Sequence, residues 1–315
     1  MASIRILNSL PTSITRSGRF AKVTAPVTAY RTFSSSSLRL DLEPFKEGKD
    51  LRTVPAASST EKAYPNFSLR DKAYVVTGGG RGLGLTIAEA MVQAGAQDTP
   101  HPDFALSQEA SKNTEGSIHY HHVDVRDREY LNKTISHITK EHGQISGLVA
   151  AAGIQRVKDA VDHTLQDVAE VMDVNFTGVF MSANAVAQQM MQTKRPGSIV
   201  LVASMSGMIA NKGLTCPAYN ASKAAIIQLT RNLAMEWGKY GIRVNALCPG
   251  HIITPMVQKN FEEVPGLKET WEKENMLGRL AVPEEFTGAT IFMLSPASSF
   301  MTGSCLVVDG GHTAW

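Results

Sequence analysis

The sequence predicts an α/β fold in which helices flank both faces of a single doubly wound parallel β-sheet. From residue 67 onward, short apolar runs rich in β-branched residues alternate with longer segments of helical periodicity. The connections are short, and strand–helix–strand units of this kind form right-handed crossovers within one parallel sheet. No internal repeat and no second alternation follow, so we expect one domain over residues 66–315.

The apolar runs are expected as strands, and the segments between them as helices. The strand runs are KAYVVTG (72–78), SIHYHHVDV (117–125), SGLVAAAG (146–153), GSIVLVAS (197–204), IRVNALCPG (242–250) and GSCLVVDGG (303–311). Helices are expected over 83–96, 128–143, 165–192 and from Tyr219 to about Tyr240, the first two ending at Gly95 and Gly143.

One region departs from the alternation. Residues 97–116, QDTPHPDFALSQEASKNTEG, contain no apolar run where the second strand of the sheet should lie. Pro100 and Pro102 also argue against a central strand, because proline cannot donate a ladder hydrogen bond. We therefore expect this strand to be shortened or missing.

The bulk composition excludes several classes of function. Of 315 residues, 43% are hydrophobic and 19% charged, with a net charge of +2, so nothing favours a nucleic-acid partner. No apolar run approaches the roughly 18 residues of a membrane span. The cysteines, Cys216, Cys248 and Cys305, lack paired spacing and suit buried thiols. His119, His121 and His122 lack further ligands, so we expect no metal.

The N-terminal segment has its own composition. Residues 1–36 contain Arg and Lys but no Asp or Glu, are rich in Ser and Thr, and end in RTFSSSS. This composition is typical of a mitochondrial transit peptide, and RTFSSSS is similar to fungal presequence processing sites. We expect import into the matrix; the alternative is a disordered tail on a cytoplasmic protein. Residues 37–65 are polar and contain proline, as in a linker.

Two local patterns carry chemistry. TGGGRGLG (77–84) directly follows a predicted strand and opens a predicted helix. Glycines at such a turn let the backbone approach a pyrophosphate, and the helix N-terminus offers free N–H groups to it. In PAYNASKAAII (217–227), Tyr219 and Lys223 are four positions apart and share one helix face. The pair predicts a phenol whose pKa is lowered by the neighbouring ammonium.

The spacing T-G-x-x-x-G-x-G and the motifs after it resemble the short-chain dehydrogenase/reductase family, from residue 73 to 311. The matching segments are HVDVRD, AAAG (150–153, for the usual N-N-A-G), MDVNFTG, ASMSG, the Y-x-x-x-K of Tyr219 and Lys223, and CPGHIIT (248–254). The resemblance implies a Rossmann-type catalytic domain that binds NAD(H) or NADP(H). The cofactor-binding residues it implies are Gly78, Arg81, Gly82, Leu83, Gly84, Asp124, Val125, Ala152, Gly153, Asn175, Tyr219, Lys223, Pro249, Gly250, Ile252 and Thr254.

The resemblance also implies catalytic roles. Tyr219 would be the general acid or base, and Lys223 would tune its pKa and bind the ribose. Ser204 would hydrogen-bond the substrate oxygen, and Asn175 would hold a water that relays protons. Ser206 competes with Ser204; we favour Ser204 because its position relative to Gly207 is fixed.

The cofactor's phosphate preference depends on the missing second strand. In the family, an acid at the end of that strand selects NAD and basic residues select NADP. Asp98 and Asp103 are candidates by proximity alone, and Arg81 occurs with both cofactors. We lean to NAD(H).

The expected reaction interconverts a secondary alcohol and a ketone. Within the family, GGGRGLG and SMSGMIAN are similar to fungal polyol and ketose reductases, so a polyol is the first expectation. The alternative is a ketoreductase for an acyl or secondary-metabolite carbonyl, whose pocket Met205, Met208 and Met256 would line. A non-catalytic binding or structural subunit stays open because the second strand is missing. The segment 255–282 is a candidate substrate lid. The helices at 165–192 and 219–238, with Ile227, Leu229 and Leu233 outward, would form a homodimer or homotetramer.

Overall fold

The predicted strands pair into one parallel sheet. The computed structural model describes residues 66–96 and 118–315. Within these ranges the sheet has five strands in the order β1-β2-β3-β4-β5, each parallel to its neighbour. The strands are β1 (Tyr74–Thr77), β2 (Gly147–Ala150), β3 (Gly197–Val202), β4 (Ile242–Pro249) and β5 (Cys305–Val308).

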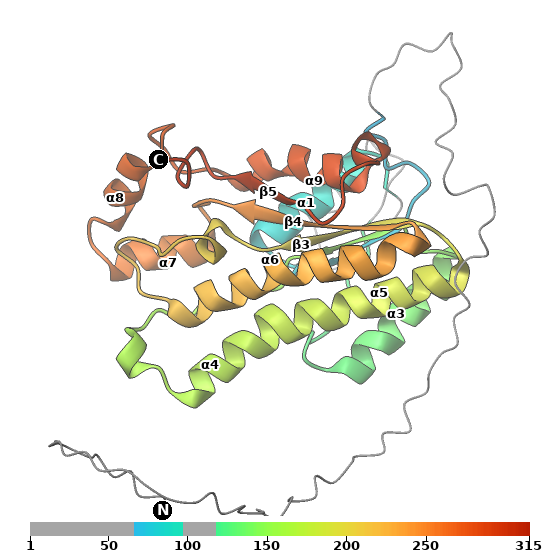
Figure 1. Ribbon diagram of the computed structural model, residues 1–315, viewed down its shortest axis with the longest axis horizontal. Coiled ribbons are helices and arrows are strands. Elements are labelled where there is room, and N and C mark those ends of the chain that lie inside the picture. Colours follow the sequence, from blue (N-terminus) through green and yellow to red (C-terminus); the bar gives the residue numbers. More distant parts are fainter. Residues whose placement is uncertain (1–65, 97–117) are drawn as a thin grey trace, which may run out of the picture. The chain divides into compact units, whose positions relative to one another are not determined.

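Helices cover both faces of this sheet (Figure 1). One face carries α3 (Arg128–His142), α5 (Val179–Thr193) and α6 (Pro217–Trp237), and the other carries α1 (Gly82–Gln93) and α9 (Thr287–Leu294). Successive strand residues divide between the two: Leu148 packs with the first group of helices and Val149 with the second. A strand buried on both faces is apolar at nearly every position, which explains the nearly continuous apolar runs in the sequence.

The half of the sheet beyond β1 differs from the prediction. The strand expected over 117–125 is wrong for its described part, because residues 118–125 form no strand. Strands are held by ladder hydrogen bonds to a neighbour, and here the neighbour would come from the region that contains Pro100 and Pro102. Within the described residues, 66–96 and 118–315, no strand lies beyond β1, so these residues form only one half of the doubly wound arrangement. The expected transit peptide, linker, Asp98 and Asp103 lie outside the described residues.

The helix predicted over 165–192 is interrupted. It consists of α4 (Leu165–Met172), a π-helical segment (Asp173–Gly178) and α5. Thr164 and Asp167 form a capping box that fixes the start of α4. π-Helical turns inside α-helices occur frequently at functional sites, and this one contains Asn175.

The candidate lid segment is helical, as predicted. It forms α7 (Pro255–Glu263) and α8 (Leu267–Glu274). Leu267 and Trp271 of α8 bury their side chains against Leu214 and Cys216 in a small apolar cluster separate from the two sheet clusters. Short 3-10 turns lie at Ala160–Asp162, Met205–Gly207, Gly238–Tyr240, Pro283–Phe286 and Pro296–Ser298.

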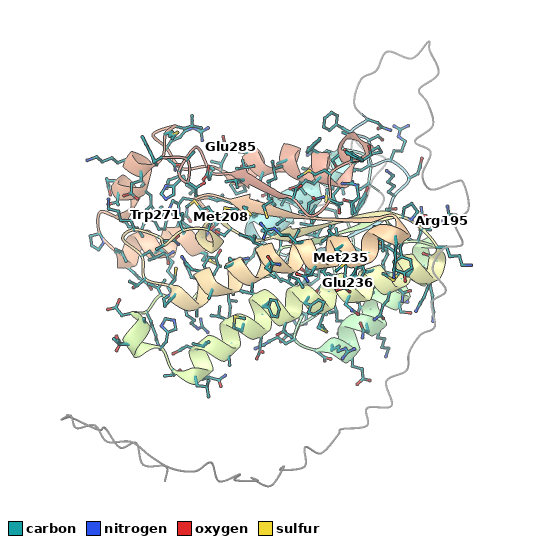
Figure 2. All side chains as sticks on the ribbon, in the orientation of Figure 1. Arg195, Met208, Met235, Glu236, Trp271 and Glu285 are labelled. Atoms are coloured by element: carbon teal, nitrogen blue, oxygen red, sulfur yellow. The ribbon has the colours of Figure 1, made fainter. Side chains whose placement is uncertain are left out.

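The residues proposed for subunit contacts do not face outward. Ile227 and Leu233 are 7% and 2% exposed and belong to the core beneath α6, and Leu229 packs against the same core. The prediction that they form an outer apolar face is therefore wrong, because the helix turns this stripe toward the sheet. Met235, by contrast, is an apolar residue of α6 that is 71% exposed; it is labelled in Figure 2. In the part of the chain that the structure describes, no helix is long and apolar enough to cross a membrane.

Candidate active site

The predicted site residues gather at the carboxyl ends of the strands. The glycine turn follows β1, Ala152 and Gly153 follow β2, Ser204 follows β3, and Pro249 to Thr254 end and follow β4. Parallel strands bring all these ends to one edge of the sheet, where ligands bind in open α/β folds.

The turn after β1 is built for close backbone approach. Gly78 has a φ of +71°, and a Cβ on it would lie 2.7 Å from the backbone nitrogen of Ala152. A Cβ on Gly84 would meet the carbonyl oxygen of Gly78, and Gly82 also has a positive φ, +54°. Only glycine fits these contacts without strain.

The N-terminus of α1 suits an anionic ligand. Arg81 is its N-cap residue but makes no side-chain cap, and no acidic residue lies in the first turn. The first N–H groups of a helix have no partner within the helix, and the helix dipole favours negative charge there. These features fit the pyrophosphate of a dinucleotide held by Gly78, Gly82, Leu83 and Gly84.

Beside this turn lies a cavity of about 250 Å3 between β1 and residues 118–125. The glycines of the turn, Tyr120, Val123 and Val125 line it. Asp124 is turned to solvent and forms an ion pair with Arg126 at 2.6 Å. The hydrogen bonds from Arg126 lower the pKa of the Asp124 carboxyl.

Of the two candidate serines, Ser204 is the one that interacts with Tyr219 in the electrostatics of the site. The Ser204 side chain is hydrogen-bonded to the Tyr219 phenol, and its Oγ accepts a hydrogen bond of 3.1 Å from the backbone N–H of Ser206. Both serines are buried. Ser204 is the N-cap residue of the short 3-10 turn Met205–Gly207, and this position fixes the geometry of its side chain.

Lys223 lies beneath the tyrosine. Its side chain is 4% exposed, and Nζ donates a hydrogen bond of 2.8 Å to the carbonyl oxygen of Val202 at the end of β3. Nζ is 5.6 Å from the centroid of the Tyr219 ring. Burial lowers the pKa of Lys223 to about 8.

The predicted low-pKa phenol is wrong for the protein alone. Burial raises the pKa of Tyr219 to about 12, and the hydrogen bond with Ser204 lowers it only in part. Desolvation of the phenolate is the largest effect on this pKa, and the nearby Lys223 ammonium donates to the Val202 carbonyl and not to the phenol oxygen. The sequence shows that Tyr219 and Lys223 share a helix face, but it does not show how much water reaches them.

Asn175 clamps the loop after β2. Its Oδ1 accepts a hydrogen bond of 2.8 Å from the N–H of Ile154, and its Nδ2 donates to the Ile154 carbonyl and to Ser222 Oγ, both at 3.0 Å. A Cβ on Gly153 would lie 3.5 Å from Asn175 Oδ1 and 3.7 Å from Lys223 Nζ. The π-helical segment thus joins this loop to the lysine; the water-holding role of Asn175 stays a prediction.

The segment after β4 is packed tightly. A Cβ on Gly250 would lie 2.6 Å from Asp309 Cα, and Ile252 forms an isolated bridge with Ala281. Thr254 caps α7, with Oγ1 accepting from the N–H of Val257 at 3.4 Å. This segment therefore leads directly from the sheet into α7 and α8, the helices of the candidate lid.

The methionines differ in exposure. Met205 is 1% exposed and is part of the buried turn, whereas Met208 and Met256 are 43% and 41% exposed. Met208 lies at the same end of the domain as Trp271 of α8 (Figure 2). Among the described residues, no three His, Cys, Asp or Glu side chains are grouped so as to hold a metal ion.

Sequence reasoning missed an aromatic stack beside α8. The His251 ring stacks on Trp271 with centroids 3.6 Å apart, and His312 approaches His251 edge-on at 5.0 Å. Burial lowers the pKa of His251 to about 3. The signal was present as histidines in CPGHIIT and GGHTAW, but only the fold brings them together.

This stack predicts acid-sensitive stability. The pKa of His251 in the folded protein, about 3, lies below the ordinary histidine value of 6.5, so the unfolded chain takes up the proton first as pH falls. The stabilisation is fully present above pH 6.5 and is lost between pH 6.5 and 3. At about 1.4 kcal/mol per pKa unit, the loss is on the order of several kcal/mol.

Urea unfolding at pH 7.5 and 5 measures this effect. His251→Phe should keep the stack on Trp271 and flatten the pH dependence, whereas His137→Gln, at an exposed position on α3, should leave it unchanged. If the free energy of unfolding fell equally between pH 7.5 and pH 5 in wild type and in His251→Phe, His251 would not be the source of the acid sensitivity.

Known proteins similar to this chain include dehydrogenases and reductases. A family model described as enoyl-(acyl carrier protein) reductase matches residues 78–313. A protein of Aspergillus versicolor named short chain dehydrogenases/reductase notP′ is 37% identical over 284 residues, 86% of this chain and 96% of that protein. D-arabinitol 2-dehydrogenase [ribulose-forming] of Scheffersomyces stipitis is 35% identical over 270 residues, 80% of this chain and 97% of that protein.

A solved structure is similar in both fold and sequence. A gluconate 5-dehydrogenase from Burkholderia cenocepacia J2315, in complex with NADP and tartrate, superposes with a TM-score of 0.72 at 30% identity. The match covers 80% of this chain and 98% of that protein.

Proposed function

The chain belongs to the short-chain dehydrogenase/reductase family, and from this premise we propose that it interconverts a polyol and the corresponding ketose. It is an oxidoreductase that acts on secondary alcohols and ketones. The observation that carries the proposal is the contact among Ser204, Tyr219 and the buried Lys223 at the edge of the sheet that holds the glycine turn.

A nicotinamide dinucleotide fits the residues present. The cradle of Gly78, Gly82 and Gly84 and the uncapped start of α1 suit its pyrophosphate, and Lys223 would bind the ribose. When bound, the nicotinamide supplies or accepts the hydride. We expect NAD(H) or NADP(H), with a lean to NAD(H); the NADP complex of the similar gluconate 5-dehydrogenase makes NADP(H) the alternative to test.

The residues of this chain move and place the proton. With a pKa raised to about 12, Tyr219 is protonated at neutral pH and can give its proton to a carbonyl oxygen as general acid. Ser204 would hydrogen-bond the same oxygen where charge develops. In the oxidising direction Tyr219 must lose its proton, and the Lys223 ammonium is the nearby group that stabilises the phenolate.

A polyol is favoured over an acyl or secondary-metabolite carbonyl. A similar enzyme is named for D-arabinitol, and another was solved with tartrate, a hydroxylated acid. The exposed Met208 and Met256 are what the apolar alternative rests on.

The test uses a chain that starts at Ser37. Its fluorescence is titrated with NADH and, separately, with NADPH, and the chain is then screened for oxidation of C5 and C6 polyols. Tight binding of one dinucleotide and turnover of a polyol are expected. Turnover of long-chain ketones alone would favour the acyl alternative. No binding of either dinucleotide would favour a non-catalytic subunit.

We further infer that residues 1–36 direct the protein to the mitochondrial matrix and that it forms a homodimer or homotetramer. The composition of the segment supports the first inference. Import into isolated mitochondria with cleavage near Ser34 to Ser37 tests the targeting.

The exposed Met235 on α6 supports a subunit contact at this helix. Sedimentation of Met235→Glu compared with wild type tests the assembly into a homodimer or homotetramer.

A further inference from the structure

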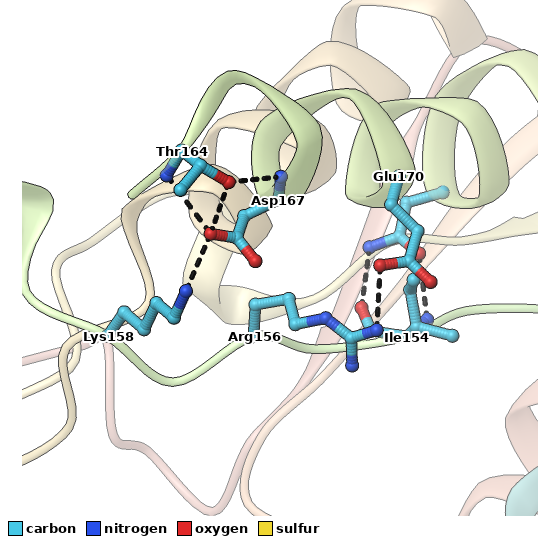
Figure 3. A network of polar contacts seen from close by, with 7 residues as sticks. Ile154, Arg156, Lys158, Thr164, Asp167 and Glu170 are labelled. Carbon is cyan, nitrogen blue, oxygen red and sulfur yellow. Dashed lines mark hydrogen bonds and ion pairs between the residues drawn. The ribbon is translucent and has the colours of Figure 1, made fainter. Parts of the chain in front are cut away.

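The loop after β2 alternates its side chains between two partners. Even-numbered positions bind α4 and the π-helical segment that follows it: Asn175 holds the Ile154 backbone, Arg156 pairs with Glu170 at 2.7 Å, and Lys158 pairs with Asp167 at 2.6 Å. Figure 3 shows these contacts on one side of the loop. In an extended chain, successive side chains point to opposite sides, so Gln155 and Val157 face away from α4.

The odd-numbered positions face the lid. Val157 packs against the cluster formed by Leu214, Cys216 and Trp271. Gln155 Oε1 accepts a hydrogen bond of 3.1 Å from Asn260 Nδ2, and Asn260 on α7 is 5% exposed. The charges of the loop are therefore paired on α4, and the lid side receives an uncharged amide.

This amide pair is connected to the start of α6, the helix that carries Tyr219. The Gln155 amide also hydrogen-bonds the Cys216 thiol, and Cys216 Sγ donates to Asn220 Oδ1 at 3.2 Å. Tyr219 packs against the same cluster as Cys216 and Val157. A chain of neutral polar groups thus runs from α7 to the start of α6, the helix that carries Tyr219.

We propose that Gln155 and Asn260 bind the hydroxyl groups beside the reacting carbon and so make the site select polyhydroxylated substrates. This inference rests on the proposed function. An amide offers both donors and acceptors, and after the Gln155–Asn260 bond each side chain still has an unused N–H. Hydroxyl groups match such a pair, whereas the hydrocarbon of an acyl chain would leave the remaining amide N–H groups without partners.

The test compares two five-carbon alcohols and several variants. kcat/KM is measured for D-arabinitol and for 2-pentanol, which lacks the neighbouring hydroxyls, in wild type, Gln155→Leu and Asn260→Leu. Losing such hydrogen bonds should lower kcat/KM for D-arabinitol by about 10- to 100-fold and leave 2-pentanol within about threefold. Gln258→Leu is the matched control, an exposed amide on the same helix, and should change neither value.

A binding measurement keeps the two proposals separable. The shift in melting temperature caused by D-arabinitol needs no turnover and should disappear in Asn260→Leu. Equal losses for both alcohols, or a wild type that does not distinguish them, would overturn the hydroxyl-binding role while alcohol oxidation stands. If D-arabinitol shifted the melting temperature in wild type but not in Asn260→Leu, and no turnover occurred, the proposed reaction would be wrong and the binding site would stand.

Discussion

Tyr219→Phe is expected to lower kcat by about 10²- to 10⁴-fold, the usual contribution of a well-placed general acid. The substitution removes one oxygen, which in the structure is hydrogen-bonded to Ser204. The ring and its contacts with the Cys216 cluster remain, so folding and dinucleotide affinity should change little. The measurement is the steady-state rate together with a dinucleotide titration of the same preparation.

The pH profile separates a chemical role from a structural one. Wild-type reduction should depend on a group that titrates near pH 8, since burial lowers the pKa of Lys223 to about 8, and this dependence should persist in the residual activity of Tyr219→Phe. Tyr130→Phe is the matched control at an exposed site, 48% exposed on α3. A rate within threefold of wild type for Tyr219→Phe, by the usual spread of neutral substitutions, would remove Tyr219 from the reaction.

Gly78→Ala is expected to abolish tight dinucleotide binding and to destabilise the fold. The φ of +71° strains any residue with a Cβ, by roughly 1–2 kcal/mol. The new methyl would also lie 2.7 Å from the Ala152 nitrogen, and overpacking of this kind typically adds about 1–3 kcal/mol. The turn must then move away from β2 and take the pyrophosphate cradle with it.

The control for this substitution is Gly238→Ala. That glycine follows α6 with a helical φ of −56°, and a Cβ on it would meet nothing within 4 Å. It should melt at or slightly above the wild-type temperature and bind dinucleotide normally. If Gly78→Ala bound NADH or NADPH as tightly as Gly238→Ala, the glycine turn would not be the pyrophosphate site.

Much of the architecture follows from periodicity. The apolar runs at β1 to β5 are continuous because both faces are covered, so their positions could be read from the sequence. The pairing of Tyr219 with Lys223 follows from helical spacing alone. The choice of Ser204 over Ser206 agrees with the contact to Tyr219 in the structure.

The features that could not be predicted depend on contacts between residues that are distant in the sequence. The pattern at 118–125 looks like a strand, but a strand exists only where a neighbour accepts its ladder. The pKa of Tyr219 depends on burial by segments distant in sequence. Gln155 and Asn260 are 105 positions apart, and neither belongs to a motif, so only the fold relates them.

The close packing of Gly207 has a consequence for how such a site can diversify. A Cβ on Gly207 would lie 2.7 Å from the backbone of Lys223 and Ala224, and Lys223 Nζ is tied to Val202. The Gly207 contact and the Lys223–Val202 hydrogen bond therefore hold the segment with Ser204 against the segment with Lys223. Residues 208–216 form an excursion between these two segments. Changes of length in the part of this excursion outside the buried Leu214 and Cys216 should therefore leave the proton-transfer groups in place, so new substrate preferences can arise there while the chemistry is inherited unchanged.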